Sequence, residues 1–288
     1  MTKLALGTVQ FGLQYGAVSR SPPMDLKTVL KILEVARIGG VSMLDTAPSY
    51  GISEHLIGQA KAEDFDVVTK VSDLLFADDD DCCALKVRKQ LQGSLDRLKR
   101  SSIYGLLVHS TNELNGENGE KIWAELESMK SEGLVKRIGA SIYQAEDLNE
   151  MALRTIDIVQ LPVNVLDARL SRSGVLSELK SKGIEIHARS IFLQGLLIAD
   201  KGKVPNIFEP WRQRLEAFWL WCNEQQVSPM QACIHHVLNM EEIDKVIVGV
   251  DSTEQLIELL AASKRYINSF PMELQLEDPA LLDPRRWV

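Results

Sequence analysis

Four residues with catalytic potential stand at or just after short apolar runs. Asp45 and Tyr50 lie five residues apart, Lys70 ends a β-branched run, and His109 ends another. A tyrosine hydroxyl, with a pKa near ~10, is a poor acid at neutral pH. A nearby Lys70 ammonium would stabilise the phenolate, Asp45 would hold the ammonium, and His109 would hydrogen-bond beside the phenol. Together they would form a proton donor for a carbonyl oxygen that is becoming an alkoxide.

Each of these residues also has an ordinary structural explanation. An Asp at a strand end often accepts backbone hydrogen bonds in a turn, and a Tyr there can pack with its hydroxyl in water. Lys70 and His109 would then be a solvated lysine and a hydrogen-bonded histidine. Taken singly, Tyr50, Lys70 and His109 favour a structural role, and for Asp45 the two explanations are evenly balanced. Their occurrence together at strand ends favours a catalytic function.

The spacing of apolar runs predicts the scaffold that positions these residues. Strand-like runs alternate with helix-like runs, which is typical of a parallel sheet. Eight strands are expected, at residues 4–10, 41–46, 66–71, 103–110, 135–141, 156–162, 183–190 and 244–249. Eight such units in 288 residues predict a single-domain (β/α)8 TIM barrel over residues 1–288, whose active site lies at the carboxyl ends of the strands. An open doubly wound sheet would carry a G-x-G-x-x-G turn, which residues 7–16 do not fit.

The segments between the strands predict the helices and the tail. Asp25 should cap a helix that carries Leu26, Val29, Leu30 and Leu33, and Ser53 should cap one that runs to Gly58. Further helices are expected at residues 85–98, 122–132, 168–182, 210–226, 229–238 and 252–262. Residues 270–288, which contain three prolines, should form an extended cover over part of the barrel.

Charge and cysteine content narrow the function class. The net charge of −8 disfavours general nucleic-acid binding, and no apolar run is long enough to span a bilayer. The N-terminal residues read as a strand instead of a signal peptide. Cys82, Cys83, Cys222 and Cys233 fit neither a disulfide framework nor a zinc site, so no metal is expected. We expect a cytoplasmic monomer or weak oligomer that acts on a small molecule.

The motifs around the four polar residues resemble the aldo-keto reductase family over almost the whole chain. LDTAPSYGISEHLIG is similar to the signature that holds the family's catalytic Asp and Tyr, VVTKV to its Lys strand, and LLVHS to its His strand. Asp45, Tyr50, Lys70 and His109 thus match the family tetrad. RSIFLQGLL resembles a bacterial branch. The resemblance implies that NADPH or NADH reduces an aldehyde, ketone or sugar-like carbonyl and that Tyr50 protonates its oxygen.

The same resemblance implies a cofactor site. Family members hold the nicotinamide carboxamide with Ser, Asn and Gln; here Ser141 and Gln160 match, but Ile142 replaces Asn. The remaining implied cofactor contacts are Ser190, Phe192 and Gly195 after strand seven, and Gly249, Ser252 and Gln255 after strand eight. Residues 249–258 contain Asp251 and Glu254 but no basic residue. The family favours NADPH and the local charge favours NADH, so the preference stays open.

The substrate pocket and the competing functions are the least constrained by sequence. Phe11, Phe192 and Trp211 are the candidate substrate contacts. One alternative is a nicotinamide-binding sensor or regulatory protein on the same fold, supported only by Ile142 and the acidic loop. A hydrolase or lyase using Asp45 with His109 would leave Lys70 and Tyr50 without roles, and the spacing of metal ligands is absent.

Overall fold

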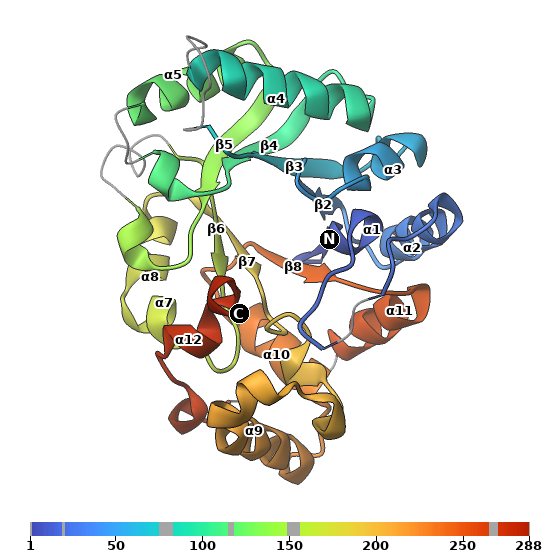
Figure 1. Ribbon diagram of the computed structural model, residues 1–288, viewed down its shortest axis with the longest axis vertical. Coiled ribbons are helices and arrows are strands. Elements are labelled where there is room, and N and C mark those ends of the chain that lie inside the picture. Colours follow the sequence, from blue (N-terminus) through green and yellow to red (C-terminus); the bar gives the residue numbers. More distant parts are fainter. Residues whose placement is uncertain are drawn as a thin grey trace.

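The strands of the chain close into a parallel barrel, as expected (Figure 1). The computed structural model describes residues 2–18, 21–74, 83–114, 118–148, 156–264 and 270–287. The strands are β1 (Leu4–Gly7), β2 (Met43–Asp45), β3 (Asp66–Val71), β4 (Ile103–Val108), β5 (Val135–Ser141), β6 (Ile158–Pro162), β7 (Glu185–Arg189) and β8 (Lys245–Gly249). Each pairs in parallel with its sequence neighbours, and β8 closes on β1. The (β/α)8 prediction is confirmed.

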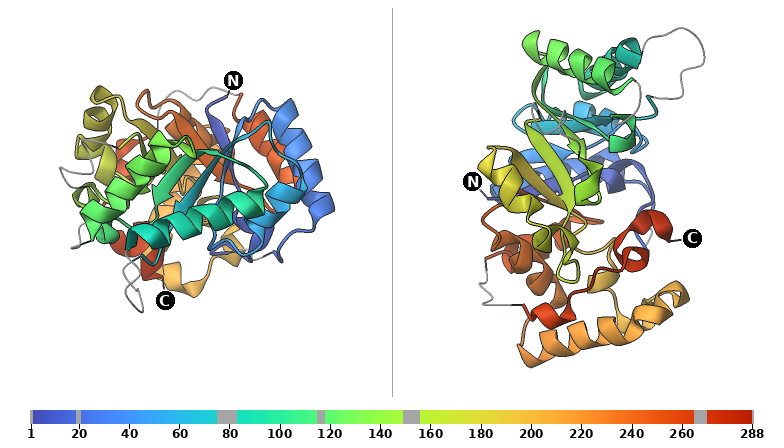
Figure 2. Two further views of the ribbon diagram at one scale, coloured as in Figure 1. Left: turned by 90° about the horizontal axis from the view of Figure 1, so that it is seen from above. Right: turned by 90° about the vertical axis from the view of Figure 1, so that its left-hand side faces the viewer.

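Helices surround the strands, as the two further views in Figure 2 show. They are α1 (Val9–Gly12), α2 (Leu26–Ile38), α3 (Ser53–Gln59), α4 (Cys83–Leu98), α5 (Gly119–Ser131), α7 (Arg169–Arg172), α8 (Val175–Ser181), α9 (Arg212–Glu224), α10 (Pro229–Leu238) and α11 (Thr253–Ala262). The Asp25 carboxylate caps α2 by accepting from Thr28 N at 2.8 Å, as predicted. Leu30, however, faces outward and is 44% exposed. Among the described residues, no helix is both long and apolar enough to cross a membrane.

Several predicted boundaries were wrong for identifiable reasons. Strand β1 ends at Gly7, and the short helix α1 follows it. Ser53 is the first residue of α3 and does not cap it; its hydroxyl donates instead to Thr8 O at 2.9 Å. The helix expected over residues 168–182 is divided between α7 and α8 by Gly174, whose φ of 79° is left-handed.

The helix expected at residue 210 begins later. Pro210 lies within a 3-10 segment, η5 (Asn206–Trp211), and α9 starts at Arg212.

Between β5 and β6, the described residues include the 3-10 turn η2 (Ala145–Asp147). The acidic run at residues 78–81 and Cys82 lie outside the described residues. Cys83, Cys222 and Cys233 are buried free thiols.

The C-terminal tail is only partly extended. It contains η6 (Met272–Leu274), α12 (Pro279–Leu282) and η7 (Pro284–Arg286). Backbone hydrogen bonds tie Leu276 to the loop after β6, and Leu281 and Leu282 are fully buried in a cluster with residues of α9. Trp287 packs edge-on against Phe208, with ring centroids 4.8 Å apart. The tail therefore folds back onto the loops after β6 and β7.

A polar cluster fills the barrel near the starts of its strands. Glu185 accepts hydrogen bonds from the Tyr104 hydroxyl at 2.6 Å and from His187 Nε2 at 2.8 Å, and it pairs with Arg137 at 3.2 Å. Burial opposes ionisation of Glu185, but His187, Tyr104 and Arg137 outweigh it and lower the pKa of Glu185 to about 2. One carboxylate thus accepts hydrogen bonds from β4 and β7 and forms an ion pair with β5.

Replacing Glu185 with Ala should lower the free energy of unfolding by about 2–4 kcal/mol, because it leaves buried donors unpaired. Since the pKa of Glu185 is depressed in the folded state, its contribution is complete above the unfolded pKa of ~4.3. It is lost as the pH falls toward about 2. Urea denaturation at pH 7 and pH 3 measures both effects.

Glu178→Ala is the matched control for this experiment. Glu178 is 52% exposed on α8 and pairs with Lys182, so its loss should cost less than about 1 kcal/mol. Equal destabilisation by the two variants at pH 7 would contradict the role assigned to the cluster.

Candidate active site

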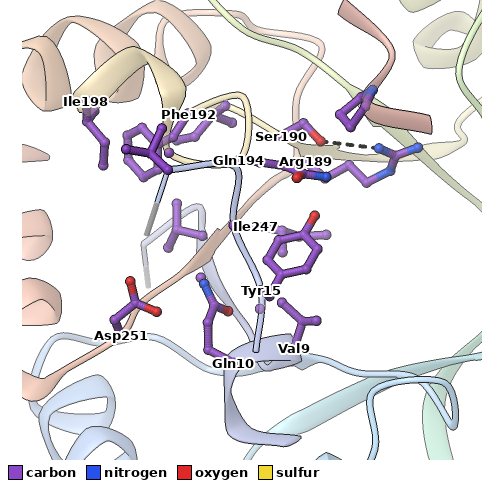
Figure 3. A pocket seen from close by; sticks show the side chains of 18 of the residues that line it. Val9, Gln10, Tyr15, Arg189, Ser190, Phe192, Gln194, Ile198, Ile247 and Asp251 are labelled. Carbon is purple, nitrogen blue, oxygen red and sulfur yellow. Dashed lines mark hydrogen bonds between the residues drawn. The ribbon is translucent and has the colours of Figure 1, made fainter. Parts of the chain in front are cut away.

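One cavity of about 590 Å³ opens at the carboxyl ends of the strands. Its walls come from the ends of β1, β2, β4, β6, β7 and β8, the following loops and the tail. Figure 3 shows several of these side chains projecting into one space. Among the residues predicted from sequence, those that line it are Asp45, Tyr50, His109, Gln160, Ser190, Phe192, Gly195, Gly249 and Gln255. Parallel pairing brings these sequence-distant residues together, because it aligns the strand ends.

A buried ion pair lies beneath this cavity. Lys70 is only 1% exposed, and its ammonium contacts the two carboxylate oxygens of Asp45 at 2.8 and 2.9 Å. The ammonium also donates to Thr46 O at 3.0 Å. Burial opposes the charged form, but Asp45 and then Tyr50 raise the pKa of Lys70 above its ordinary value. Lys70 therefore remains a cation next to the cavity.

Tyr50 lies directly beside that cation. The Lys70 ammonium is 5.1 Å from the centroid of the Tyr50 ring. Burial raises the pKa of Tyr50, whereas the charge of Lys70 acts to lower it. The residue is thus a protonated phenol whose anion has a stabilising partner in place.

The loop that presents Tyr50 is packed too closely for ordinary side chains. A Cβ at Gly12 would collide with the Tyr50 carbonyl oxygen, so α1 reaches this loop only through glycine. Gly51 has a φ of 58°, in the left-handed region that glycine adopts without strain. These two glycines explain how a strand end and a short helix hold the Tyr50 backbone at the cavity rim.

His109 enters the same cavity from the end of β4. Its backbone N–H donates to Val71 O at 2.9 Å, which continues the pairing of β3 and β4. Burial, followed by the positive charges of Lys70 and Arg189, lowers the pKa of His109 to about 4. The imidazole is therefore neutral at physiological pH and offers one donor and one acceptor nitrogen.

Gln160 connects the opposite side of the barrel to the ion pair. Its amide nitrogen donates to Asp45 Oδ1 at 2.7 Å. Ser141 is its register partner on β5 and is 3% exposed, but it does not line the cavity. Ile142 is fully buried, and its carbonyl accepts from Arg189 Nη2 at 3.1 Å. The position where the family pattern has Asn is thus filled by an apolar side chain.

The loops after β7 and β8 have the geometry of a ligand cradle. Ser190 and Gly195 have φ values of 60° and 88°, and Phe192 lies between them on the cavity wall. Ser252 caps α11 by accepting from Gln255 N at 3.2 Å. Ser252 itself is not a lining residue, although Gln255 is.

Polar atoms in this region fit a nicotinamide dinucleotide. Gln10 Oε1 and Asp251 Oδ1 are buried without a hydrogen-bond partner in the described structure, and both residues line the cavity. A Cβ at Gly249 would meet the Gln10 amide at 2.5 Å, so glycine at this position leaves room for that amide against the end of β8. Unpaired buried oxygens of this kind can be satisfied by a ligand that donates hydrogen bonds, such as ribose hydroxyls.

Two of the residues predicted to contact the substrate, Phe11 and Trp211, lie outside the cavity wall. Phe11 is fully buried in the hydrophobic core, because α1 turns its side chain away from the cavity. Trp211 is half-buried against α9 and donates its indole N–H to Asp278 at 2.8 Å. Neither lines the cavity; of the three predicted contacts, only Phe192 does.

Other lining residues were not assigned to the site from sequence. Arg285 and Gln194 line the cavity, yet they lie in segments with no strand or helix periodicity to mark them. A guanidinium in the tail or an amide in a loop gives no sequence signal of its spatial neighbours. Arg189 could be anticipated, since it lies next to the end of the seventh predicted strand.

Known proteins similar to this chain agree with its fold and site. The model of the aldo/keto reductase family matches residues 3–271. The chain is 27% identical to L-galactose dehydrogenase from Arabidopsis thaliana, covering 98% of this chain and 92% of that protein. It is 26% identical to an NADH-specific methylglyoxal reductase from Escherichia coli, covering 91% and 93%.

Solved structures add agreement on the fold. A glycerol dehydrogenase from Gluconobacter oxydans superposes with a TM-score of 0.70 over 92% of this chain and 88% of that one, at 20% identity. Because the family match spans most of the barrel, the resemblance to this family is confirmed. The chain is an oxidoreductase that belongs to the aldo/keto reductase family.

Proposed function

We propose that this protein uses a reduced nicotinamide cofactor to reduce a small aldehyde, ketone or sugar-like carbonyl compound, with Tyr50 as the proton donor. The observation that carries the proposal is the buried Lys70–Asp45 pair beside Tyr50. A neutral His109 lines the same cavity. The names of two relatives, a galactose dehydrogenase and a methylglyoxal reductase, support carbonyl and alcohol chemistry.

In the proposed reaction each side chain has one task. A bound nicotinamide supplies the hydride that the carbonyl carbon receives. Tyr50 donates its hydroxyl proton to the oxygen as negative charge develops there. The Lys70 ammonium stabilises the phenolate left behind, and Asp45 keeps that ammonium in place. Neutral His109 hydrogen-bonds the carbonyl oxygen and orients it toward Tyr50.

The cofactor contacts follow from the cavity walls. Gln160, on the cavity wall, would contact the nicotinamide carboxamide, and Ser141 beside it on β5 is the second proposed contact, although it does not line the cavity. Ile142 offers no side-chain amide for a third contact. The proposed contacts to the pyrophosphate and the adjoining ribose are Ser190, Phe192, Gly195, Gly249 and Gln255, which line the cavity, and Ser252, which caps α11 beside them. Asp251 has a buried, unpartnered carboxylate oxygen, which would accept from ribose hydroxyls. That carboxylate would repel a 2′-phosphate, so we propose a preference for NADH over NADPH.

Tyr50→Phe should lower kcat by about 10²–10⁴-fold, because it removes the proton donor and leaves the ring in place. Steady-state oxidation of NADH with 4-nitrobenzaldehyde measures the effect. Cofactor affinity, followed by fluorescence quenching, should change little.

Tyr104→Phe provides the control, since Tyr104 lies near the strand starts and contacts Glu185 instead of the cavity. Its kcat should stay within about twofold of wild type. If Tyr50→Phe turned over as fast as wild type, Tyr50 would not be the donor. Tight NADH binding without turnover of any aldehyde by the wild type would favour the sensor alternative.

Asp251→Ser should raise the ratio of kcat/KM for NADPH to that for NADH by about tenfold or more, because it removes a negative charge beside the 2′ position. Glu254→Gln is the matched control: Glu254 is fully exposed in the first turn of α11. Its substitution should change the ratio by less than about threefold. A wild-type preference for NADPH that Asp251→Ser does not alter would contradict the assignment.

A further inference from the structure

Arg189 brings an uncompensated positive charge into the catalytic cavity. Its guanidinium donates to Ser190 Oγ at 3.3 Å and to Ile142 O at 3.1 Å, and both acceptors are neutral. No carboxylate in the described part of the chain lies within ion-pair distance of it. A guanidinium has five N–H donors, so donors remain beyond these two contacts.

The other cations on the cavity wall are already paired. Lys203 contacts Asp200 at 2.8 Å, and Arg285 contacts Asp283 at 2.7 Å. The Asp45 carboxylate is likewise neutralised by Lys70. Arg189 therefore stands apart among the described basic lining residues, in a protein whose net charge is −8.

Neighbouring groups hold the Arg189 side chain in one place. Its Cζ lies 4.1 Å from the centroid of the Tyr143 ring, and the Cζ of Arg285 lies 3.5 Å from that centroid. Such stacking and the two hydrogen bonds restrict the long side chain before any ligand binds. A pre-positioned guanidinium loses little rotamer freedom on binding an anion, which favours affinity.

The position of Arg189 relative to Tyr50 and His109 indicates which bound molecule would carry the anionic group that Arg189 contacts. Arg189 ends β7, whereas Tyr50 follows β2, and both line the mouth of the same cavity. Arg189 is close enough to His109 to contribute to its lowered pKa. Figure 3 shows Asp251, the proposed ribose contact, on the opposite side of the cavity from Arg189. Arg189 therefore lies at the end of the cavity where the proposed reaction takes place, and the Asp251 carboxylate lies at the opposite end.

We propose that the natural substrate is a carbonyl compound that carries a carboxylate, and that Arg189 binds this carboxylate while the carbonyl faces Tyr50 and His109. The inference rests on the proposed reductase function. One unpaired cation matches one negative charge, and the planar guanidinium matches the two carboxylate oxygens. Arg189 is then a specificity-determining residue of the substrate site.

Three aldehydes that share one scaffold test the proposal: 4-formylbenzoate, its methyl ester and 4-formylphenyl phosphate. Wild-type kcat/KM should be at least about tenfold higher for the carboxylate than for the ester, mainly through KM. Arg189→Gln should reduce that preference by about 10–100-fold, mainly by raising KM for 4-formylbenzoate. Arg189→Lys keeps the positive charge but lacks the planar pair of N–H donors, so it should retain part of the preference for the carboxylate.

Arg285→Gln is the matched control, because Arg285 also flanks Tyr143 but its charge is paired with Asp283. It should change the carboxylate preference by less than about threefold. Equal losses in both variants would assign the effect to the general potential of the cavity and overturn the role of Arg189. A phosphate preferred over the carboxylate would overturn the substrate class.

Two further measurements separate this inference from the reductase proposal. Calorimetric binding of 4-formylbenzoate and its ester to the protein saturated with NAD⁺ does not depend on turnover. Tighter carboxylate binding that Arg189→Gln abolishes supports the inference even where no aldehyde is reduced. Equal binding of the two compounds overturns it, while reduction of the ester that requires Tyr50 would leave the reductase intact. A parallel loss of NADH affinity in Arg189→Gln would show that Arg189 serves the cofactor instead.

Discussion

Burial of the Lys70 ammonium against the Asp45 carboxylate is the constraint on which the candidate active site of this barrel depends. Placing two charges in the interior costs several kcal/mol per ion unless both are paired and hydrogen-bonded. Here Thr46 O and the Gln160 amide provide the remaining contacts. The pair therefore ties β2, β3 and β6 together, and it sets a fixed positive charge beside Tyr50. The geometry that satisfies the ion pair also places a cation beside the proton donor that we propose.

The rest of the rim is arranged around that charge. His109 is kept neutral by burial and by the cations near it. In the proposed reaction it therefore orients the carbonyl oxygen by a hydrogen bond and adds no further positive charge beside Lys70. Gly12 and Gly51 let the Tyr50 loop pack closely where a side chain would collide or be strained. Beyond this centre, within the part of the chain that the structure describes, the cavity has a cation without an acidic partner at Arg189 and an unsatisfied carboxylate oxygen at Asp251. In our proposals these two ends distinguish substrate from cofactor.

Much of the fold could be predicted because buried parallel strands are short apolar runs with few alternatives. The strands at residues 66–71 and 135–141 match the structure to the residue. Errors arose where a local signal had a competing tertiary use. Ser53 has the right side chain for a cap, but its hydroxyl bonds Thr8 across the barrel rim. Periodicity continued through Gly174, yet the backbone turns there.

Residue types and their spacing in the sequence determined the barrel, the strand-end positions of Asp45, Lys70 and His109, and the chemistry that these groups can perform together. Tertiary structure alone decided which side chains share the cavity and which charges are neutralised there. Phe11 follows a strand end but is buried in the core, whereas Arg285 arrives from the far end of the chain. Local propensities act over a few residues. Burial and charge pairing depend on contacts between residues separated by tens to hundreds of positions, and these contacts exist only after the barrel has closed.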